Sequence, residues 1–239
     1  MIDREAPTHR PAGPARGYQQ WRSLLFMHWP IPIDIIRPRV PARLELDLLE
    51  GTAYVGVVPF VMQGVRPRWW PNRLAFEFLE TNVRTYVCHN GQPGVYFFSL
   101  DAASQLAVWT ARRLWGLPYY RAQMHIEQTG DEFHYRSRRH GSGARHEVRY
   151  RLDEMLGPSK LGTIEHFLLE RYLLFLEHQH SIYVGQVHHA PYPAQRAEVL
   201  AVDDQLIQSA GLGQILEPPE LVHFAAGVDV EVFDMRRTE

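Results

Sequence analysis

A series of β-prone segments joined by short glycine turns is the feature of this sequence that most constrains its fold. Residues 74–89 alternate apolar and polar side chains, and the turn Asn90-Gly91 leads into a second β-prone segment, residues 95–100. Asparagine and glycine tolerate the positive φ angles of a tight hairpin turn. The two segments are therefore predicted to pair as antiparallel strands.

Three further segments follow one another closely and predict an antiparallel meander. They are residues 119–128, 132–139 and 144–152, and only a few glycine-containing turn residues separate them. Additional strands are predicted over residues 181–189, 198–202 and 220–233. Strands that come in runs, roughly nine here, with a few helices between them are typical of the α+β class.

Three helices are predicted from capping residues and apolar spacing. The first begins at Asp101 or Ser104, whose side chains can cap it, and ends at Trp115. The second covers residues 163–177 with Thr163 as its N-cap, because apolar side chains recur there at helical spacing. The third covers residues 203–210 and ends at Gly211.

Two apolar segments near the N-terminus are predicted to belong to the core. Residues 21–30 form an apolar run that Pro30 ends. Residues 53–63 are rich in β-branched and aromatic side chains and contain Pro59. Because proline has no backbone N–H, this second segment is predicted to be a strand with a bulge or an edge strand.

Composition limits the domain organisation and the partners. Residues 1–17 contain three prolines and no apolar run, which predicts a flexible N-terminal tail, and residues 18–239 are predicted to form a single domain. A net charge of −2 gives no field that would attract nucleic acid or a membrane surface. No apolar run reaches the length of a membrane span. The single cysteine, Cys88, fits a cytoplasmic protein without disulfides.

Residues 111–120 resemble the active-site motif of the acetoacetate decarboxylases. The segment reads Ala-Arg-Arg-Leu-Trp-Gly-Leu-Pro-Tyr-Tyr, and the family motif reads roughly Gly-Arg-Glu-x-aromatic-Gly-aromatic-Pro-Lys-Lys. Further blocks between residues 18 and 233 resemble the YqjF-like domain-of-unknown-function family, a relative of the acetoacetate decarboxylases. These blocks are residues 24–30, 54–60, 80–87, 93–101 and 185–191.

The resemblance implies a fold and a set of pocket residues. It implies a mostly antiparallel β-barrel or cone with a few external helices, and a small barrel of this kind can enclose one ligand. In the acetoacetate decarboxylases a glutamate precedes a strand that lines the pocket, and Glu80 falls at the matching place. Asn82 and Arg84 follow at two-residue steps, so they are expected on the same face of the strand as Glu80.

This trio of side chains suits a ligand with a carboxylate or an oxo group. Arg84 can hold a carboxylate bidentately, Glu80 can transfer a proton, and Asn82 can orient a carbonyl group. We therefore predict Glu80 as a catalytic residue, and Asn82 and Arg84 as ligand-binding residues. A structural alternative is an ion pair between Glu80 and Arg84 that holds the barrel wall.

Tyrosines stand where the resemblance places the two lysines of the motif. Tyr119 and Tyr120 cannot form an imine, and the one lysine of the chain, Lys160, lies in a predicted loop elsewhere. A phenol can still donate a hydrogen bond to an enolate, or act as a general acid if its pKa is lowered. Tyr119 is predicted to be catalytic and Tyr120 to bind the ligand, although neighbouring strand residues face opposite ways and at most one can enter a pocket.

Histidines and tryptophans give weaker signals. His188 is predicted to bind the ligand, but no metal site is expected, because no carboxylate or cysteine falls at a recognised spacing from the histidines of residues 178–189. No cofactor motif is present. Trp69 and Trp70 can form a lid over a barrel or a surface for a partner protein.

The sequence thus predicts a protein that binds a small acidic or oxo-containing molecule, such as a carboxylate or an oxo-acid. If it is an enzyme, lyase or isomerase chemistry by general acid and base is expected rather than Schiff-base decarboxylation. The alternatives are a non-catalytic ligand sensor or carrier and a protein-interaction module. A homo-oligomer is also expected, because barrels with open edges associate.

Overall fold

A thirteen-stranded, largely antiparallel sheet makes up most of the protein. The computed structural model describes residues 2–105, 108–109 and 116–238. The strands are β1 (Gly17–Ile31), β2 (Glu45–Leu46), β3 (Ala53–Pro67), β4 (Phe76–His89), β5 (Gln92–Ala102), β6 (Tyr119–Thr129), β7 (Glu132–Arg139), β8 (Arg145–Pro158), β9 (Leu173–His178), β10 (Ser181–His188), β11 (Pro193–Asp204), β12 (Leu221–Val232) and β13 (Arg236–Arg237). The short helices are η1 (Ala6–Thr8), α1 (Ile33–Ile36), η2 (Arg37–Arg39), η3 (Asn72–Leu74), α3 (Ile164–Leu169) and α4 (Leu206–Ser209).

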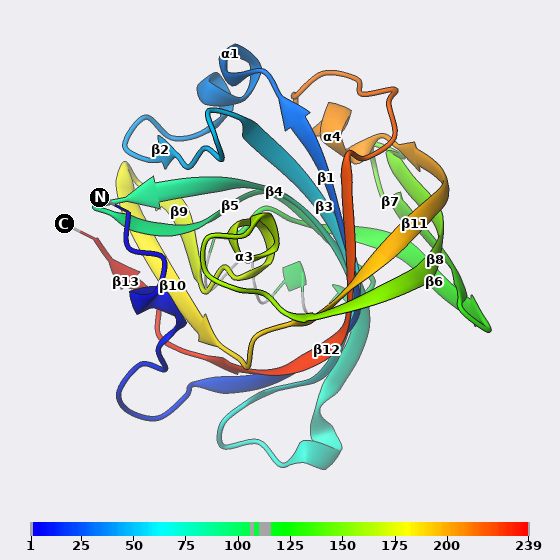
Figure 1. The fold of residues 1–239 in the computed structure, drawn as a ribbon. Helices are drawn as coiled ribbons and strands as arrows, with labels where there is room; N and C mark the ends of the chain where they lie inside the picture. The colour runs from blue at the N-terminus through cyan, green and yellow to red at the C-terminus, as the bar shows by residue number, and fades with distance from the viewer. Residues whose placement is uncertain (1, 106–107, 110–115, 239) are drawn as a thin grey trace.

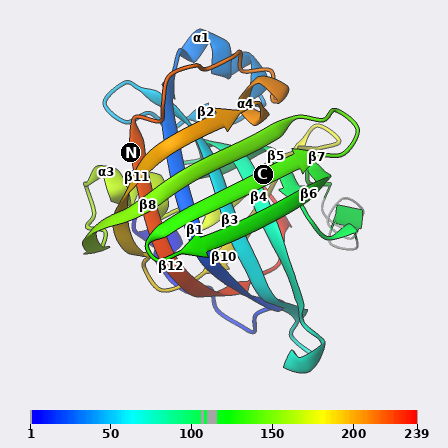
Figure 2. The ribbon, with the colours of Figure 1, turned by 90° about the vertical axis from the view of Figure 1, so that its right-hand side faces the viewer.

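Two additional strand pairings, β4 with β5 and β10 with β12, close this sheet into two rings. The first ring runs β4-β5-β9-β10-β12-β1-β3 and closes where β3 pairs with β4. The second ring leaves β5 through β6, β7, β8 and β11 and returns to β12. Both rings share the wall β12-β1-β3-β4-β5. Figure 1 looks along the first ring with α3 across its opening, and Figure 2 shows β6, β7, β8 and β11 of the second ring.

The shared wall explains why its strands carry continuous apolar runs. Residues 24–29 of β1 and 53–60 of β3 are buried at every position. Successive side chains point to opposite faces of a strand. Leu24 accordingly packs in one apolar cluster with Val58, while Leu25 packs in another cluster with Val57 and Tyr150 of β8. A strand that is buried on both faces shows no apolar and polar alternation.

Most of the predicted strands are confirmed. The Asn90-Gly91 hairpin joins β4 to β5, and β6, β7 and β8 form the predicted meander. The segment around Pro59 is an interior strand, so the edge-strand alternative is wrong. The pairing of β1 with β3 shifts register opposite Pro59, where residues 23–26 of β1 face residues 58–60 of β3. The extra residue of this bulge therefore lies in β1 and not in the strand that contains the proline.

The helix predicted over residues 163–177 is only half correct. Thr163 caps α3 by accepting a hydrogen bond from the backbone N–H of His166, as expected, but the helix ends at Leu169. Residues 173–178 form β9, which pairs with β10 and with β5. Gln179 and His180 have positive φ angles and make the tight turn into β10. Strand pairing on both sides therefore outweighs the helical spacing of the side chains.

Two other predictions of helix ends also change. Asp101 belongs to β5, and its carboxylate accepts hydrogen bonds from Arg139, so its predicted role as a helix cap is wrong. Most of the helix predicted up to Trp115 lies outside the described residues. The third helix is shorter than predicted, because β11 extends to Asp204 before α4 begins.

The N-terminal segment predicted to be a flexible tail contacts the barrel. Arg4 forms two hydrogen bonds with the carboxylate of buried Asp47, and Pro7 is buried. The backbone N–H of Asp3 donates to the carbonyl of Gly91. Flexibility of this segment stays a prediction. No helix in the described ranges is long and apolar enough to cross a bilayer.

Candidate functional site

A cavity of about 150 Å³ lies inside the first ring. Strands β1, β3, β4, β5, β9, β10 and β12 contribute to its wall, together with the start of β6 and the segment after α3. Most of the wall is apolar. Its polar side chains include Glu80, Asn82, Arg84, Tyr119 and Arg171.

The structure brings Glu80, Asn82 and Arg84 together in this cavity, as the two-residue spacing predicted. All three are buried and line it from β4. Thr81, the residue between Glu80 and Asn82, points the other way and hydrogen-bonds to Tyr135 in the second ring. The β period of the sequence therefore placed three polar side chains on the cavity face of a single strand.

Glu80 forms a buried pair with Tyr119. The phenol of Tyr119 donates a hydrogen bond of 2.9 Å to Oε2 of Glu80. Burial raises the pKa of Glu80 to about 8, although the hydrogen bond from Tyr119 lowers it, and the nearby carboxylate of Asp101 raises it further. Glu80 is therefore mostly protonated at neutral pH.

Tyr119 does not have the lowered pKa that a general acid would need. Burial, followed by the proximity of Glu80, raises the pKa of Tyr119 well above its ordinary value. A phenol in such a site stays protonated and serves as a hydrogen-bond donor. Of the two roles predicted for Tyr119, this environment favours hydrogen-bond donation over general-acid catalysis.

Arg84 has no carboxylate partner among the residues that the structure describes. The alternative of an ion pair with Glu80 is wrong, because the Nη2 group of Arg84 instead donates to the carbonyl of Leu168 over 3.1 Å. The guanidinium also lies over the ring of Phe26, 5.4 Å from its centroid. Nε of Arg84 and Oδ1 of Asn82 are both buried without a hydrogen-bond partner among the described residues. Unpartnered buried polar atoms are rare and point to a missing ligand or water.

Arg171 is a cavity residue that the sequence analysis missed. Its Nη1 donates to Asp47 over 2.7 Å and its Nε to the carbonyl of Phe167 over 2.6 Å, while Nη2 is buried without a partner in the described structure. Asp47 also binds Arg4 of the N-terminal segment. The signal in the sequence was the charged pair Glu170-Arg171 inside the apolar run of residues 167–174.

Tyr120 and His188 do not line the cavity, so the structure does not support them as ligand contacts. Tyr120 faces away from Tyr119, as alternation along the strand predicted, and the guanidinium of Arg139 lies 4.0 Å from its ring centroid. His188 lies beside Tyr172, with the ring centroids 6.5 Å apart. The neighbouring His189 is closer to the cavity wall, because its ring stacks on Tyr172 at 4.5 Å.

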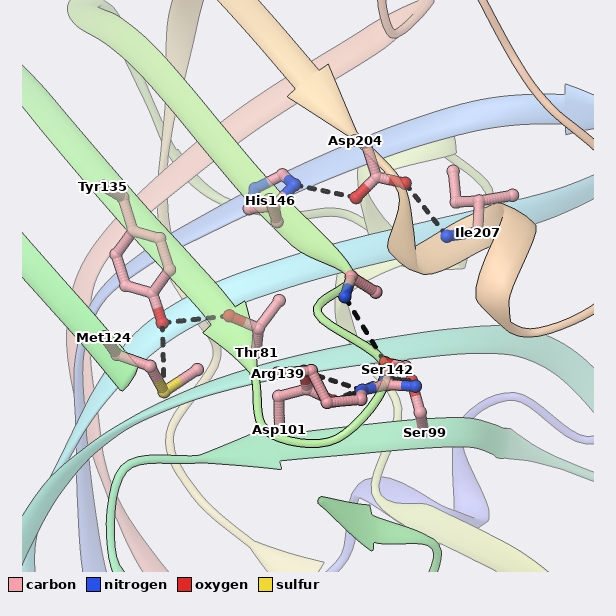
Figure 3. A network of polar contacts seen from close by, with 11 residues as sticks. Thr81, Ser99, Asp101, Met124, Tyr135, Arg139, Ser142, His146, Asp204 and Ile207 are labelled. Atoms are coloured by element: carbon pink, nitrogen blue, oxygen red, sulfur yellow. Dashed lines mark hydrogen bonds and ion pairs between the residues drawn. The ribbon is translucent and has the colours of Figure 1, made fainter. Parts of the chain in front are cut away.

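A polar network in the second ring includes Thr81, the residue after Glu80, and Tyr135 (Figure 3). Tyr135 donates a hydrogen bond to the backbone carbonyl of Glu80 over 3.1 Å and also contacts the hydroxyl of Thr81. Farther along, Arg139 binds the carboxylate of Asp101 at 2.6 Å, with both side chains almost fully buried. These contacts hold β4 and β5 where they border both rings.

Other candidate features lie away from the cavity. Trp69 and Trp70 stack on each other between β3 and β4, and Trp69 is 80% exposed. Lys160 is exposed and is not part of the cavity wall. In the part of the chain that the structure describes, no three His, Cys, Asp or Glu side chains are grouped as metal ligands would be.

Residues 18–229 match the DUF2071 family, which is described as an uncharacterized conserved protein. The chain belongs to this family. This chain is also 36% identical over 221 residues to the uncharacterized protein YqjF of Bacillus subtilis (strain 168). The match covers 92% of this chain and 91% of YqjF. The resemblance to the YqjF-like family is therefore confirmed.

Solved structures confirm the acetoacetate decarboxylase-like fold of this DUF2071 protein. The acetoacetate decarboxylase of Legionella pneumophila matches with a TM-score of 0.65 at 13% identity, over 98% of this chain and 93% of that enzyme. The enduracididine biosynthesis enzyme MppR complexed with pyruvate matches with a TM-score of 0.64 at 12% identity, over 96% of this chain and 93% of MppR. At these identities the similarity shows the fold alone.

Proposed function

We propose that this protein binds a small oxo-acid in the cavity of the first ring and catalyses proton transfer on it without an imine. The observation that carries the proposal is the combination of a buried Glu80–Tyr119 pair with Arg84, a buried arginine that no carboxylate of the described residues neutralises. Two solved relatives support the ligand class, because one is an acetoacetate decarboxylase and the other is complexed with pyruvate.

Arg84 supplies the contact for the acid group. A buried guanidinium without a counter-ion is costly, and a ligand carboxylate would offset that cost with charge-assisted hydrogen bonds. Nε of Arg84 is free to donate, and Nη2 of Arg171 is a second free donor. An anionic ligand therefore suits this end of the cavity better than a neutral one.

Glu80 supplies the proton-transfer group. General acid and base catalysis is most efficient when the pKa lies near the operating pH, and the pKa of Glu80 is about 8. Ionised Glu80 would remove a proton from the carbon next to the ligand carbonyl. The Tyr119 hydroxyl would then donate a hydrogen bond to the enolate oxygen that forms. No lysine side chain takes part, since Lys160 is exposed and outside the cavity.

The test combines ligand-induced stabilisation with deuterium exchange. Oxo-acids and their neutral amides would be compared by thermal shift, where a ligand at 100 times its Kd adds about 2.7 kcal/mol. Proton NMR in D₂O would follow exchange at the carbon beside the carbonyl. We expect stabilisation by acids only, and exchange that Glu80→Gln abolishes while the matched variant Glu77→Gln, exposed on the same strand, keeps it. Absence of stabilisation by every acid would reject the proposal.

A non-catalytic sensor or carrier is the second candidate function. The missing motif lysine and the strongly raised pKa of Tyr119 both favour it, because each removes a reactive group from the cavity. This candidate requires that an acid stabilises the protein while its exchange rate stays at the rate without protein. The same two measurements therefore separate a carrier from an enzyme.

A further inference from the structure

The polar groups of the cavity gather at two separate ends. Arg84 and Arg171 share one end, because both guanidinium groups lie over the ring of Tyr86, at 5.8 and 4.9 Å from its centroid. Glu80 and Tyr119 form the other end. Glu80 and Arg84 are four positions apart in β4, which places their Cα atoms roughly 13 Å apart at about 3.3 Å per residue.

The guanidinium of Arg84 is anchored beside α3. Its Nη2 and the hydroxyl of Tyr86 both donate to one acceptor, the carbonyl of Leu168, over 3.1 and 2.9 Å. Tyr86 is two residues farther along β4 from Glu80 than Arg84 is. The acid-binding group is therefore held at the Tyr86 end of the cavity, while the carboxyl group of Glu80 pairs with Tyr119.

The wall between the two ends is mainly apolar. Leu24, Val58 and Phe97 line it, and in the strand register Val58 and Leu100 flank Asn82. Asn82 contributes the one polar group of β4 in this stretch, and its Oδ1 is buried without a partner in the described chain. Such a wall suits a ligand segment made of methylene groups.

We infer that the ligand is an extended oxo-acid whose carboxylate binds at Arg84 while its carbonyl group, several bonds away, lies at Glu80 and Tyr119. Hydrogen bonds of about 3 Å at each end leave roughly 7 Å between the two ligand groups. A C–C bond is about 1.5 Å long, so the chain between them needs at least about five bonds. A ligand of pyruvate size cannot reach both ends at once. This inference rests on the proposed function, because it assigns the substrate class to the same cavity.

The test is a chain-length series measured on the wild-type protein. Calorimetric Kd values would be obtained for methyl-ketone acids that differ only in the separation of the two groups, from pyruvate and 4-oxopentanoate to 6-oxoheptanoate. We expect 6-oxoheptanoate to bind about tenfold more tightly than pyruvate. Pyruvate held at Arg84 lacks the hydrogen bonds to its carbonyl group at the Glu80 and Tyr119 end, and a neutral hydrogen bond contributes up to about that factor. Heptanoate, which lacks the carbonyl, controls for the apolar contacts of the longer chain and should bind more weakly than 6-oxoheptanoate.

The outcomes separate this inference from the proposed function. If pyruvate binds as tightly as 6-oxoheptanoate or more tightly, the length inference is wrong and the oxo-acid proposal stands. If no acid of any length binds, both are wrong. Arg84→Met should remove the preference for the longer acid, whereas Arg149→Met, an exposed arginine of β8, should keep it. Because the series uses the wild-type protein, the test stands even if Arg84→Met does not fold.

Discussion

Replacing Glu80 by glutamine should change how the stability of the protein depends on pH. The pKa of Glu80 is about 8 in the folded protein, against an ordinary value of 4.5. Between these values the folded state binds more protons than the unfolded state, so the free energy of unfolding falls as the pH rises. Glutamine keeps the shape of the side chain and cannot ionise, and the variant therefore lacks this loss.

The size of the effect follows from the two pKa values. Each unit of difference corresponds to about 1.36 kcal/mol, and the cost accumulates from about pH 4.5 until the folded pKa is passed. Between pH 5 and pH 8 the wild type should lose roughly 3 to 4 kcal/mol relative to Glu80→Gln. Other groups that titrate in this range are common to both proteins and cancel in the difference.

Urea unfolding of both proteins at pH 5, 6, 7 and 8 would measure this difference. Glu77→Gln serves as the matched control, because Glu77 is exposed on the same strand, and its stability should follow that of the wild type. If the gap between Glu80→Gln and the wild type changes by less than about 1 kcal/mol over this range, the argument that Glu80 is buried as a neutral acid is refuted.

Three further predictions concern Tyr119, Asp101 and Lys160. Tyr119→Phe removes the hydrogen bond that lowers the pKa of Glu80, so the pKa of Glu80 should rise above 8. Carboxyl ¹³C chemical shifts measured against pH would show this rise. An unchanged pKa would contradict the pairing of Glu80 with Tyr119. Asp101→Asn leaves Arg139 buried without its counter-charge and should cost about 3–5 kcal/mol in urea unfolding, whereas a loss below about 1 kcal/mol would mean that the pair is solvated. Treatment with acetoacetate and borohydride should add no mass to the protein, as measured by mass spectrometry. Lys160 is exposed, and an exposed lysine amine forms an imine poorly. A covalent adduct would restore Schiff-base chemistry as a candidate.

Local sequence signals predicted the elements whose structure is decided locally. The Asn90-Gly91 turn fixed the β4–β5 hairpin, and Thr163 marked the start of α3. The alternation from Glu80 to Arg84 placed three side chains on one face of β4. Each of these outcomes depends on residues within a few positions of one another, and such signals are readable from one sequence.

The features that depend on distant pairing could not be predicted. Residues 173–178 have apolar side chains at helical spacing, but their two strand neighbours come from β5 and β10. The role of Arg171 depends on Asp47, which is 124 positions away in the chain. The raised pKa of Tyr119 also follows from burial that only the closed ring creates. Periodicity carries no information about such contacts.

The wall between the two rings sets a limit on how this protein can be redesigned. Val58 and Phe60 face the cavity of the first ring, while Val57, next to Val58 in β3, packs in the other apolar cluster. A substitution that enlarges the cavity at Val58 therefore leaves the lining of the second cluster in place. A single inserted residue would do the opposite, because it turns every following side chain of the strand over and exchanges the two linings at once. The shape of the first cavity can accordingly be changed by substitution along β1, β3 and β4, whereas changes in strand length would disturb both interiors together.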